Sequence, residues 1–407
     1  MKLPFSKKRG MMAVTALIML SIMVVTALST AELAMLQVRG TRNISNLQQA
    51  RQAALSAIDY CLYLTSIDAA WRQSKGSGVW ISNYAVGTAQ VSVSAEPDGG
   101  EIGDPAGKVL FTATAAAGQS SRTVQAQARP RSAEVLQYLL CGLTDSKMEL
   151  NGQVKLYGDI RAAGRIESDG TASLKGNIYA ARPDWVQPFF WDSDTTVITY
   201  ASPADPPPLN IAWYRARAQE IVLPNAPDNS LLLSRQMLTD TANPYGPAHP
   251  EGLYYMQVSN AQVVLEHCYI TGTLIIEGAH TVTIRGGYRH RPASNNYPAI
   301  ITTGRITIQI SDALREAEAA KDFNSDGDTQ DVFMSRIDGL VYCGKKFTGF
   351  NAAGYNGEFR MHGAIIAGEI RIADGRNCWI TYDPALADAL IPGFQQSSLA
   401  IVPGSLQ

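Results

Sequence analysis

The stretch that decides the fold is Lys7-Lys8-Arg9-Gly10 followed by MMAVTALIMLSIMVVTALSTA, which runs from Met11 to Ala31. No charged residue occurs from Gly10 to Ala31, a run of 22 positions. As a helix rising about 1.5 Å per residue, this run is roughly 30 Å long, the thickness of the hydrocarbon core of a bilayer. Because basic flanks stay in the cytoplasm, we expect everything after Ala31 on the far side of the membrane.

The helical pattern continues beyond this run. From Ala31 to Lys75 the only glycine is Gly40 and there is no proline, so nothing breaks a helix strongly. We therefore expect one helix from Met11 to about Trp71, roughly 90 Å long, with a bend at Gly40. Its second part, 32–75, is amphipathic and needs a packing partner. The apolar residues that recur there are Leu47, Ala54, Ile58, Cys61 and Leu62.

Three interpretations of the N-terminus are open. The first is a cleaved secretory peptide with Ser29-Thr30-Ala31 as its small-residue site, although the apolar run exceeds the usual ~7–15 residues. The second is a plain signal anchor. The third starts from the order of the residues: a short basic leader over 1–10, a glycine, an apolar helix over 11–31, and an amphipathic continuation.

That order resembles the class III leader of type IV pilins and type II secretion pseudopilins. The resemblance implies that a prepilin peptidase cuts after Gly10 and that Met11 becomes the methylated first residue. The fifth mature position is Thr15, whereas most pilins have Glu there. Tip-initiating minor pseudopilins and PilX-type assembly proteins also lack that Glu. The segments RGMMAVTALIML and QQARQAALSAIDYCLYLTSIDAAWR are most similar to the PilX-type N-terminal region.

The period changes from helical to two after the segment 74–78. Apolar and polar residues alternate in three runs, which are separated by turn chemistry at 96–100 and 117–119. The pattern predicts a small antiparallel sheet over 76–130, whose apolar face is the natural partner of the amphipathic helix. A long helix laid on such a sheet is also the head architecture of the pilin family. The alternating apolar residues are Val91, Val93, Ala95, Phe111, Ala113, Ala115, Val124, Ala126 and Ala128.

A short element returns from Met148 onward: an apolar residue, Gly and an apolar residue at alternate positions, then a small or apolar one. Such a strand cannot bury its inward face alone, and stacking it on its own copies does so, which predicts a β-solenoid over 131–395. The recurring glycine suggests a corner or a tight interior. The alternative is an ordinary antiparallel sandwich. The segment resembles the bactofilin-like and adhesin-like β-helices sometimes fused to PilX-type N-termini. The copies begin at Leu156, Leu174, Ile270, Ile337 and Met361, and the repeat places Cys268 and Cys343 inward.

Residues 181–250 hold 11 of the 20 prolines, so we expect an insertion there that interrupts the stacked strands. Within it, the segment 211–221 is predicted to form one short helix. Four aromatic residues also gather in this insertion. They either plug an open end of the solenoid or form a platform that binds a partner or stacks on sugars. These residues are Trp185, Phe189, Phe190 and Trp191.

A second insertion, over 312–334, contains the one motif with ligand spacing. Oxygen-bearing residues at positions 1, 3, 5 and 7, with Gly327 at position 6, match the first half of an EF-hand calcium loop. The match fails at position 12, where Phe333 replaces the bidentate Glu. The sequence predicts either a calcium site that stiffens the insertion or a solvated acidic turn. The candidate ligands are Asp322, Asn324, Asp326, Asp328 and Asp331.

Net charge, cysteine spacing and the few catalytic-type residues restrict the classes of function that the sequence allows. The formal net charge is −2, so no global field points to nucleic acid. The five cysteines, Cys61, Cys141, Cys268, Cys343 and Cys378, are not spaced as zinc ligand pairs, and their odd number leaves at least one unpaired in a monomer. Among groups for catalysis, His267 beside Glu266 is a lone candidate, with a plain surface residue as the alternative. The basic loop 287–291 is either a contact for an anionic surface glycan or a solvated turn.

We therefore expect a mainly β protein with a long N-terminal α-helix: a pilin-like helix with a small antiparallel sheet, then a β-helix, then a tail over 396–407. The predicted function is a non-enzymatic minor-pilin-like or PilX-type component of a type IV pilus or type II secretion pseudopilus. Expected partners are a prepilin peptidase, other pilins or pseudopilins, the inner membrane and a surface glycan, with no nucleic acid. Its C-terminal part would be periplasmic, or extracellular in a pilus. The alternatives are a membrane-anchored β-helix enzyme acting on polysaccharide and a static envelope scaffold.

Overall fold

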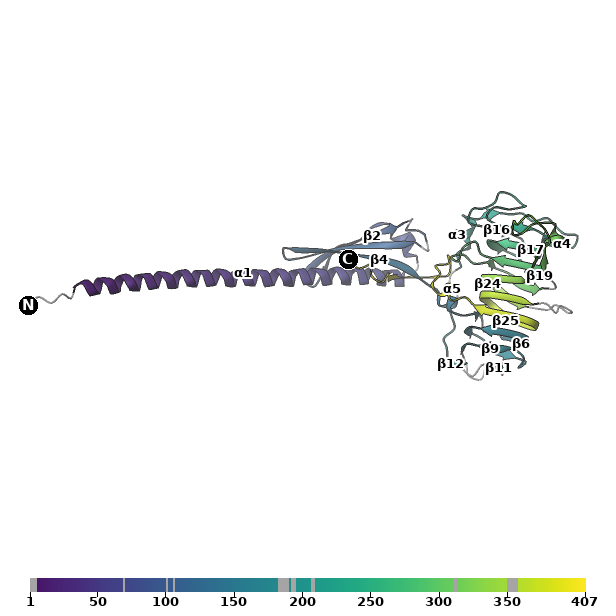
Figure 1. The fold of residues 1–407 in the computed structure, drawn as a ribbon, viewed down its shortest axis with the longest axis horizontal. Coiled ribbons are helices and arrows are strands. Elements are labelled where there is room, and N and C mark those ends of the chain that lie inside the picture. Colours follow the sequence, from purple (N-terminus) through teal and green to yellow (C-terminus); the bar gives the residue numbers. More distant parts are fainter. Residues whose placement is uncertain are drawn as a thin grey trace, which may run out of the picture. The chain divides into compact units, whose positions relative to one another are not determined.

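The structure is a computed structural model, and it describes residues 6–68, 70–99, 102–104, 107–181, 190–191, 195–205, 209–310, 313–349 and 358–407. Of residues 6–10, 190–191, 373–377 and 397 it describes the backbone alone. The chain divides into two compact units (Figure 1). Unit 1 is Met1–Arg129 with Ser397–Gln407, and unit 2 is Pro130–Gln396. The second unit is therefore an insertion between the last two strands of the first.

Unit 1 is a long helix against an antiparallel sheet. Helix α1 spans Ser6–Ile67 and is continuous through Gly40, where we expected a bend. Only its last third has a buried face. That face is made mostly of small residues, with one larger side chain, Ile58: Ala50, Ala53, Ala54, Ala57, Ile58 and Cys61. A one-turn helix, α2 (Trp71–Ser74), follows.

The sheet of unit 1 has the order β1-β2-β3-β4-β26. The alternation read from the sequence is confirmed, because all nine predicted apolar positions are buried and belong to one core with the face of α1. The residues expected to form a C-terminal tail instead include β26, which extends this sheet beside β4. The strands are β1 (Gly78–Val86), β2 (Ala89–Asp98), β3 (Lys108–Ala117), β4 (Ser120–Ser132) and β26 (Gln395–Ile401).

Unit 2 is built on a 19-stranded sheet whose neighbouring strands pair in parallel (Figure 1). Inward side chains of successive strands form one apolar core that includes Cys268 and Cys343, as the repeat predicted. A second apolar cluster lies on the outer side of some of the same strands and includes Tyr214 and Phe394. The strands over its first part are β5 (Leu140–Gly142), β6 (Met148–Tyr157), β7 (Ile160–Ala162), β8 (Ile166–Ser168), β9 (Ser173–Lys175), β10 (Ile178–Ala180), β11 (Phe190–Trp191) and β12 (Val197–Thr199).

The remaining strands of this sheet are β13 (Gln219–Glu220), β14 (Leu231–Ser234), β15 (Met237–Leu238), β16 (Leu253–Gln257), β17 (Gln262–Thr271), β18 (Thr273–Glu277), β19 (Thr281–Arg291), β20 (Ile300–Thr302), β21 (Arg305–Gln309), β24 (Ser335–Gly349) and β25 (Phe359–Tyr382). A separate pair, β22 (Leu314–Arg315) and β23 (Val332–Phe333), is antiparallel. The short helices are η1 (Glu134–Gln137), α3 (Ile211–Arg215), α4 (Glu316–Ala319) and α5 (Ala385–Asp388).

Some of the recurring glycines lie between strands, whereas Gly339 and Gly363 lie within β24 and β25. Gly158 and Gly176 follow β6 and β9, both with positive φ. A Cβ added to Gly176 would lie 2.3 Å from the carbonyl oxygen of Gly158, and one added to Gly363 would lie 1.9 Å from that of Gly339. In both pairs one glycine stacks on the other at a separation that only glycine permits. Both explanations for the repeat are therefore observed: Gly158 and Gly176 turn the chain between strands, and the close contacts leave no room for a side chain.

The order of strands in space differs from their order in the chain. The late strand β25 pairs with the early strands β5 and β6 on one side and with β24 on the other. The prediction that 181–250 interrupts the stack was wrong at four short strands, because β12, β13, β14 and β15 all pair in parallel with it, while most of the described residues of this segment lie between strands. Short strands tolerate prolines between them, and each ladder needs only two to four paired residues here. The predicted helix is α3, shorter than the expected 211–221.

Candidate functional site

The apolar part of α1 is the first candidate site. Met11 is 77% exposed, and every described residue from Met11 to Ile44 is exposed in this chain. By length and composition, α1 is the one helix among the described residues that could cross a membrane. Such a surface is stable only in lipid or against other apolar helices. Gly10 lies within α1, so the predicted cleavage point is helical in this structure.

Hydroxyl groups within this part of α1 are satisfied inside the helix. The Thr15 hydroxyl donates to the Met11 carbonyl at 2.5 Å, and Ser21 and Ser29 donate to the carbonyls four residues back at 2.8 and 2.9 Å. Bonds of this kind remove the cost of placing a hydroxyl in hydrocarbon. Thr15 therefore has its own partner within the helix.

The acidic loop is the second candidate, and it closes the hairpin β22–β23. Its two ends are held by Glu316, a fully buried carboxylate that accepts hydrogen bonds from the backbone N–H groups of Phe323 and Asp331. Beside it, the rings of Phe323 and Tyr269 stack with centroids 5.4 Å apart. The sequence did not single out Glu316, because nothing in its spacing from the motif distinguishes it from the neighbouring Glu318.

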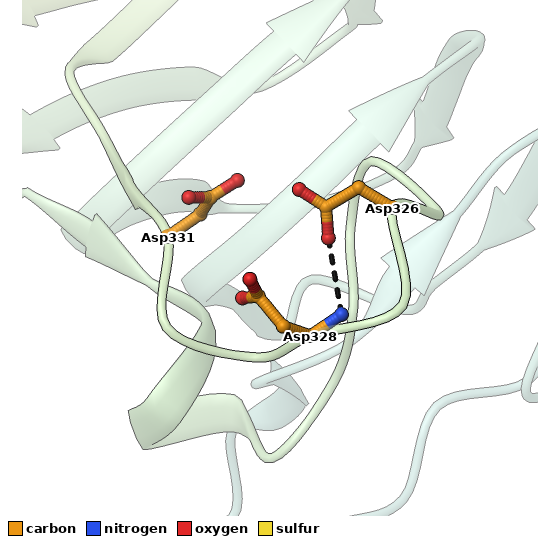
Figure 2. Close-up of side chains that lie close together, drawn as sticks. All are labelled: Asp326, Asp328 and Asp331. Atoms are coloured by element: carbon orange, nitrogen blue, oxygen red, sulfur yellow. Dashed lines mark hydrogen bonds between the residues drawn. The ribbon is translucent and has the colours of Figure 1, made fainter.

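Three of the five predicted ligands come together (Figure 2). Carboxylate oxygens of Asp326, Asp328 and Asp331 lie within 4.8 Å of one another. The Asn324 amide bridges two of them, donating to Asp326 at 2.9 Å and to Asp331 at 2.6 Å. For its oxygen to bind a cation, that amide has to turn over. Hydrogen bonds, chiefly from the Asp328 N–H, lower the pKa of Asp326.

The remaining predicted ligand, Asp322 at position 1 of the motif, has a different role. Its carboxylate accepts hydrogen bonds from the N–H groups of Ser325 (2.5 Å) and Gly327 (2.9 Å), which folds the start of the loop. Gly327 has φ +96°, a value that suits the sharp turn at position 6 of a calcium loop. The arrangement offers a divalent cation several hard oxygen ligands on one side of the loop.

Other predicted site residues lie apart from this loop or outside the described residues. Trp185 and Phe189 are outside them, and Phe190 and Trp191 are described as backbone only, paired with β9. Glu266 forms an ion pair with Arg285 at 2.9 Å, and His267 accepts the Gly287 N–H at 3.3 Å, so both are bound within their own surface. All five cysteines are buried and free.

No family model and no curated protein matches the chain. Among solved structures, the chain is similar to the competence-associated pilin ComZ from Thermus thermophilus, with 13% identity, a TM-score of 0.38, and coverage of 90% of this chain and 97% of that one. It is also similar to the DUF3494 domain of ice-binding protein 1 from Shewanella frigidimarina, with 11% identity and a TM-score of 0.24 over 62% of this chain and 98% of that one. At these TM-scores neither likeness carries an argument about this chain.

Proposed function

We propose that this chain is a pilin-type, single-pass membrane protein, of the minor-pilin or PilX type, that presents unit 2 outside the inner membrane. One observation carries the proposal: α1 packs on its own sheet only from Ala50 onward, while its apolar N-terminal part is exposed. That part suits insertion in lipid before assembly and packing against other pilins or pseudopilins afterwards. The filament is a type IV pilus or a type II secretion pseudopilus.

We infer further that unit 2 is a β-solenoid of the adhesin or bactofilin kind. The inference is supported by the in-register parallel pairs, by the stacked glycines, and by a single core made from the inward residues of successive strands. Its role would be tip formation, assembly or adhesion, without catalysis. A carbohydrate-active enzyme and a static scaffold are the rivals.

Processing at Gly10 is the direct test. We expect the protein made with an active prepilin peptidase to begin at Met11, and the protein made without it to keep its leader, by mass spectrometry of the N-terminus. Gly10→Val is expected to block the cut, and Ser6→Ala, also within the leader, is the matched control. A mature chain that begins at Glu32, or one whose size ignores the peptidase, would contradict the proposal. Turnover of a polysaccharide would favour the enzyme instead.

We also propose that the acidic loop binds calcium. Its support is the pattern of oxygen ligands with Gly327 at position 6 and the gathering of three carboxylates. Titration with Ca²⁺ in a calorimeter is expected to show one site that is lost in the double variant Asp326→Asn, Asp331→Asn. Glu220→Gln, which removes an exposed carboxylate elsewhere in unit 2, is expected to leave binding unchanged. Equal heats for the double variant and the wild type would mean a solvated acidic turn.

A further inference from the structure

One face of unit 2 carries a row of outward side chains that the sequence repeat did not reveal. The row crosses strands β17, β19, β24, β25 and β6, and it is called the basic row below. The neighbours in register along it are Tyr269 with Arg289, Arg289 with Arg336, Arg336 with Arg360, and Trp379 with Lys155. In-register strands place such neighbours about 4.8 Å apart.

Contacts within the basic row join its two halves and mix charge with aromatic surface. The Arg360 guanidinium lies over the Trp379 ring at 5.7 Å from its centroid, and the Lys155 ammonium lies over the same ring at 5.2 Å. Arg289 lies over Phe333 at 5.4 Å. The side chain of Arg360 is 50% exposed, so the row faces solvent. These stacks hold the cations in place, which lowers the entropy lost when a ligand binds.

Two of the cations also have partners on the protein. Arg336 pairs with Asp338 at 2.5 Å, and Arg360 pairs with Glu358 at 2.9 Å. A guanidinium has five N–H donors, so each pair leaves capacity for a ligand carboxylate.

A cavity of about 540 Å³ adjoins the basic row. Residues two positions further along the same strands line it, and i and i+2 share a face of a strand. Its lining mixes bases, carboxylates and an amide, a set that suits hydroxyl groups more than phosphates: Asp240, Arg291, Asn295, Asp338, His362 and Asp383.

The overall charge of unit 2 disfavours nucleic acid as the ligand of the basic row. Between Pro130 and Gln396 there are 22 Lys and Arg against 29 Asp and Glu, a formal charge of −7. Proteins that bind single-stranded nucleic acid without sequence preference combine a positively charged groove along the backbone with aromatic side chains on which successive bases stack. Here the domain is acidic, and the one tryptophan of the row already stacks on two cations.

We propose that the basic row and the adjoining cavity bind an acidic polysaccharide of the polyuronate type. Uronate carboxylates bind the arginines of the row, where charge-assisted hydrogen bonds are strongest. The apolar edge of a sugar ring packs on Trp379, and sugar hydroxyls reach the polar lining of the cavity. This inference goes beyond the proposed function and uses only unit 2, so a failure of leader processing leaves it untouched.

The test uses the purified full chain in detergent micelles and three probes. We expect oligogalacturonate to bind, its fully methyl-esterified form to bind at least about tenfold more weakly, and binding to fall as sodium chloride is raised. The third probe is a single-stranded DNA oligonucleotide. Tighter binding of the DNA than of the acid, equal binding of acid and ester, or binding of none of the probes would each overturn the proposal.

Variants locate the site. The double variant Arg360→Gln, Lys155→Gln is expected to weaken oligogalacturonate binding at least about tenfold, because two charge-assisted contacts are lost. The matched control is Arg371→Gln, which removes an exposed arginine of β25 that lies outside the basic row and pairs with Glu149 of β6, six positions before Lys155. We expect the control to bind as the wild type does. Equal affinities for the double variant and the control would overturn the proposed site, and matching thermal unfolding curves verify that both fold.

Discussion

His290 is buried in the core of unit 2 with both ring nitrogens engaged. Nε2 donates to the Gly272 carbonyl at 3.0 Å, so the neutral ring accepts the Tyr288 hydroxyl at Nδ1, 2.8 Å away. Burial lowers the pKa of His290 from 6.5 to about 4. The folded protein therefore excludes a proton that the unfolded chain binds below about pH 6.5.

A pH dependence of stability follows from this residue. Between about pH 6.5 and 4 the unfolded state binds more protons, so the free energy of unfolding falls as the pH falls, by about 3 kcal/mol at the limit. Above about pH 6.5 the ring is neutral in both the folded and the unfolded state, so His290 does not lower the free energy of unfolding there. Urea unfolding of wild type and His290→Gln over this range checks it. We expect a shallower acid slope in the variant, and equal slopes would contradict the assignment.

Stacked glycines give a second prediction at the residue scale. Gly363→Ala places a Cβ 1.9 Å from the Gly339 carbonyl oxygen, so a backbone shift is required and we expect a loss above about 3 kcal/mol. Gly170 also has positive φ (+82°) but nothing within 4 Å of the added carbon. Gly170→Ala should therefore cost only about 1–2 kcal/mol of backbone strain. Thermal unfolding of the two variants compares them, and equal losses would mean that the close contact is not the cause.

Strand β26 shows what is decided at the scale of the element. Its Leu399 is buried in the core of unit 1, and the Leu399 N–H donates to the hydroxyl of Thr65 on α1 at 3.2 Å. Thr65 is fully buried and in turn donates to the Leu62 carbonyl at 2.7 Å. A residue near the C-terminus is thereby tied to a helix more than 300 positions earlier.

Removing the Thr65 acceptor should weaken this link. Thr65→Val leaves the buried Leu399 N–H without its partner, and we expect a loss of about 1–3 kcal/mol. The matched control is Ser66→Ala, whose hydroxyl is exposed and bonds only within α1. Amide hydrogen exchange of β26 by mass spectrometry is the measurement, with faster exchange expected in Thr65→Val alone. Unchanged exchange in that variant would contradict the role given to Thr65.

At the scale of the whole molecule, unit 2 is an insertion whose ends meet. The Ala133 N–H donates to the Phe394 carbonyl at 2.9 Å, and the Ser132 hydroxyl donates to Ala389 at 2.9 Å. The segment between them has its own core. Its last long strand, β25, pairs in parallel with its first strand, β5. These features are typical of a domain that folds by itself.

We expect residues 130–396, produced alone, to be a folded and soluble domain. Its circular dichroism should be that of a β protein, and its unfolding should be cooperative. Because the exposed apolar part of α1 is absent, detergent should not be needed. A product that aggregates or unfolds gradually would show that unit 2 depends on unit 1.

The prediction from the sequence was best where a pattern is local. Alternation in 76–130 identified the buried face of three strands, and the repeat placed Cys268 and Cys343 inward, because periods of two are read directly from neighbouring residues. The acidic motif located the loop but not the buried Glu316 that holds it, since that contact depends on how the hairpin closes.

The sequence by itself determined that an uncharged helix of membrane length begins the chain and that a strand-rich body with recurring glycines follows. Only the tertiary structure decided which strands are neighbours. It placed β25 beside β5, brought β26 back to the first sheet, and aligned Arg289, Arg336 and Arg360 in one row. The physical reason is that parallel pairing and core closure join residues far apart in the chain, and no local period records such contacts.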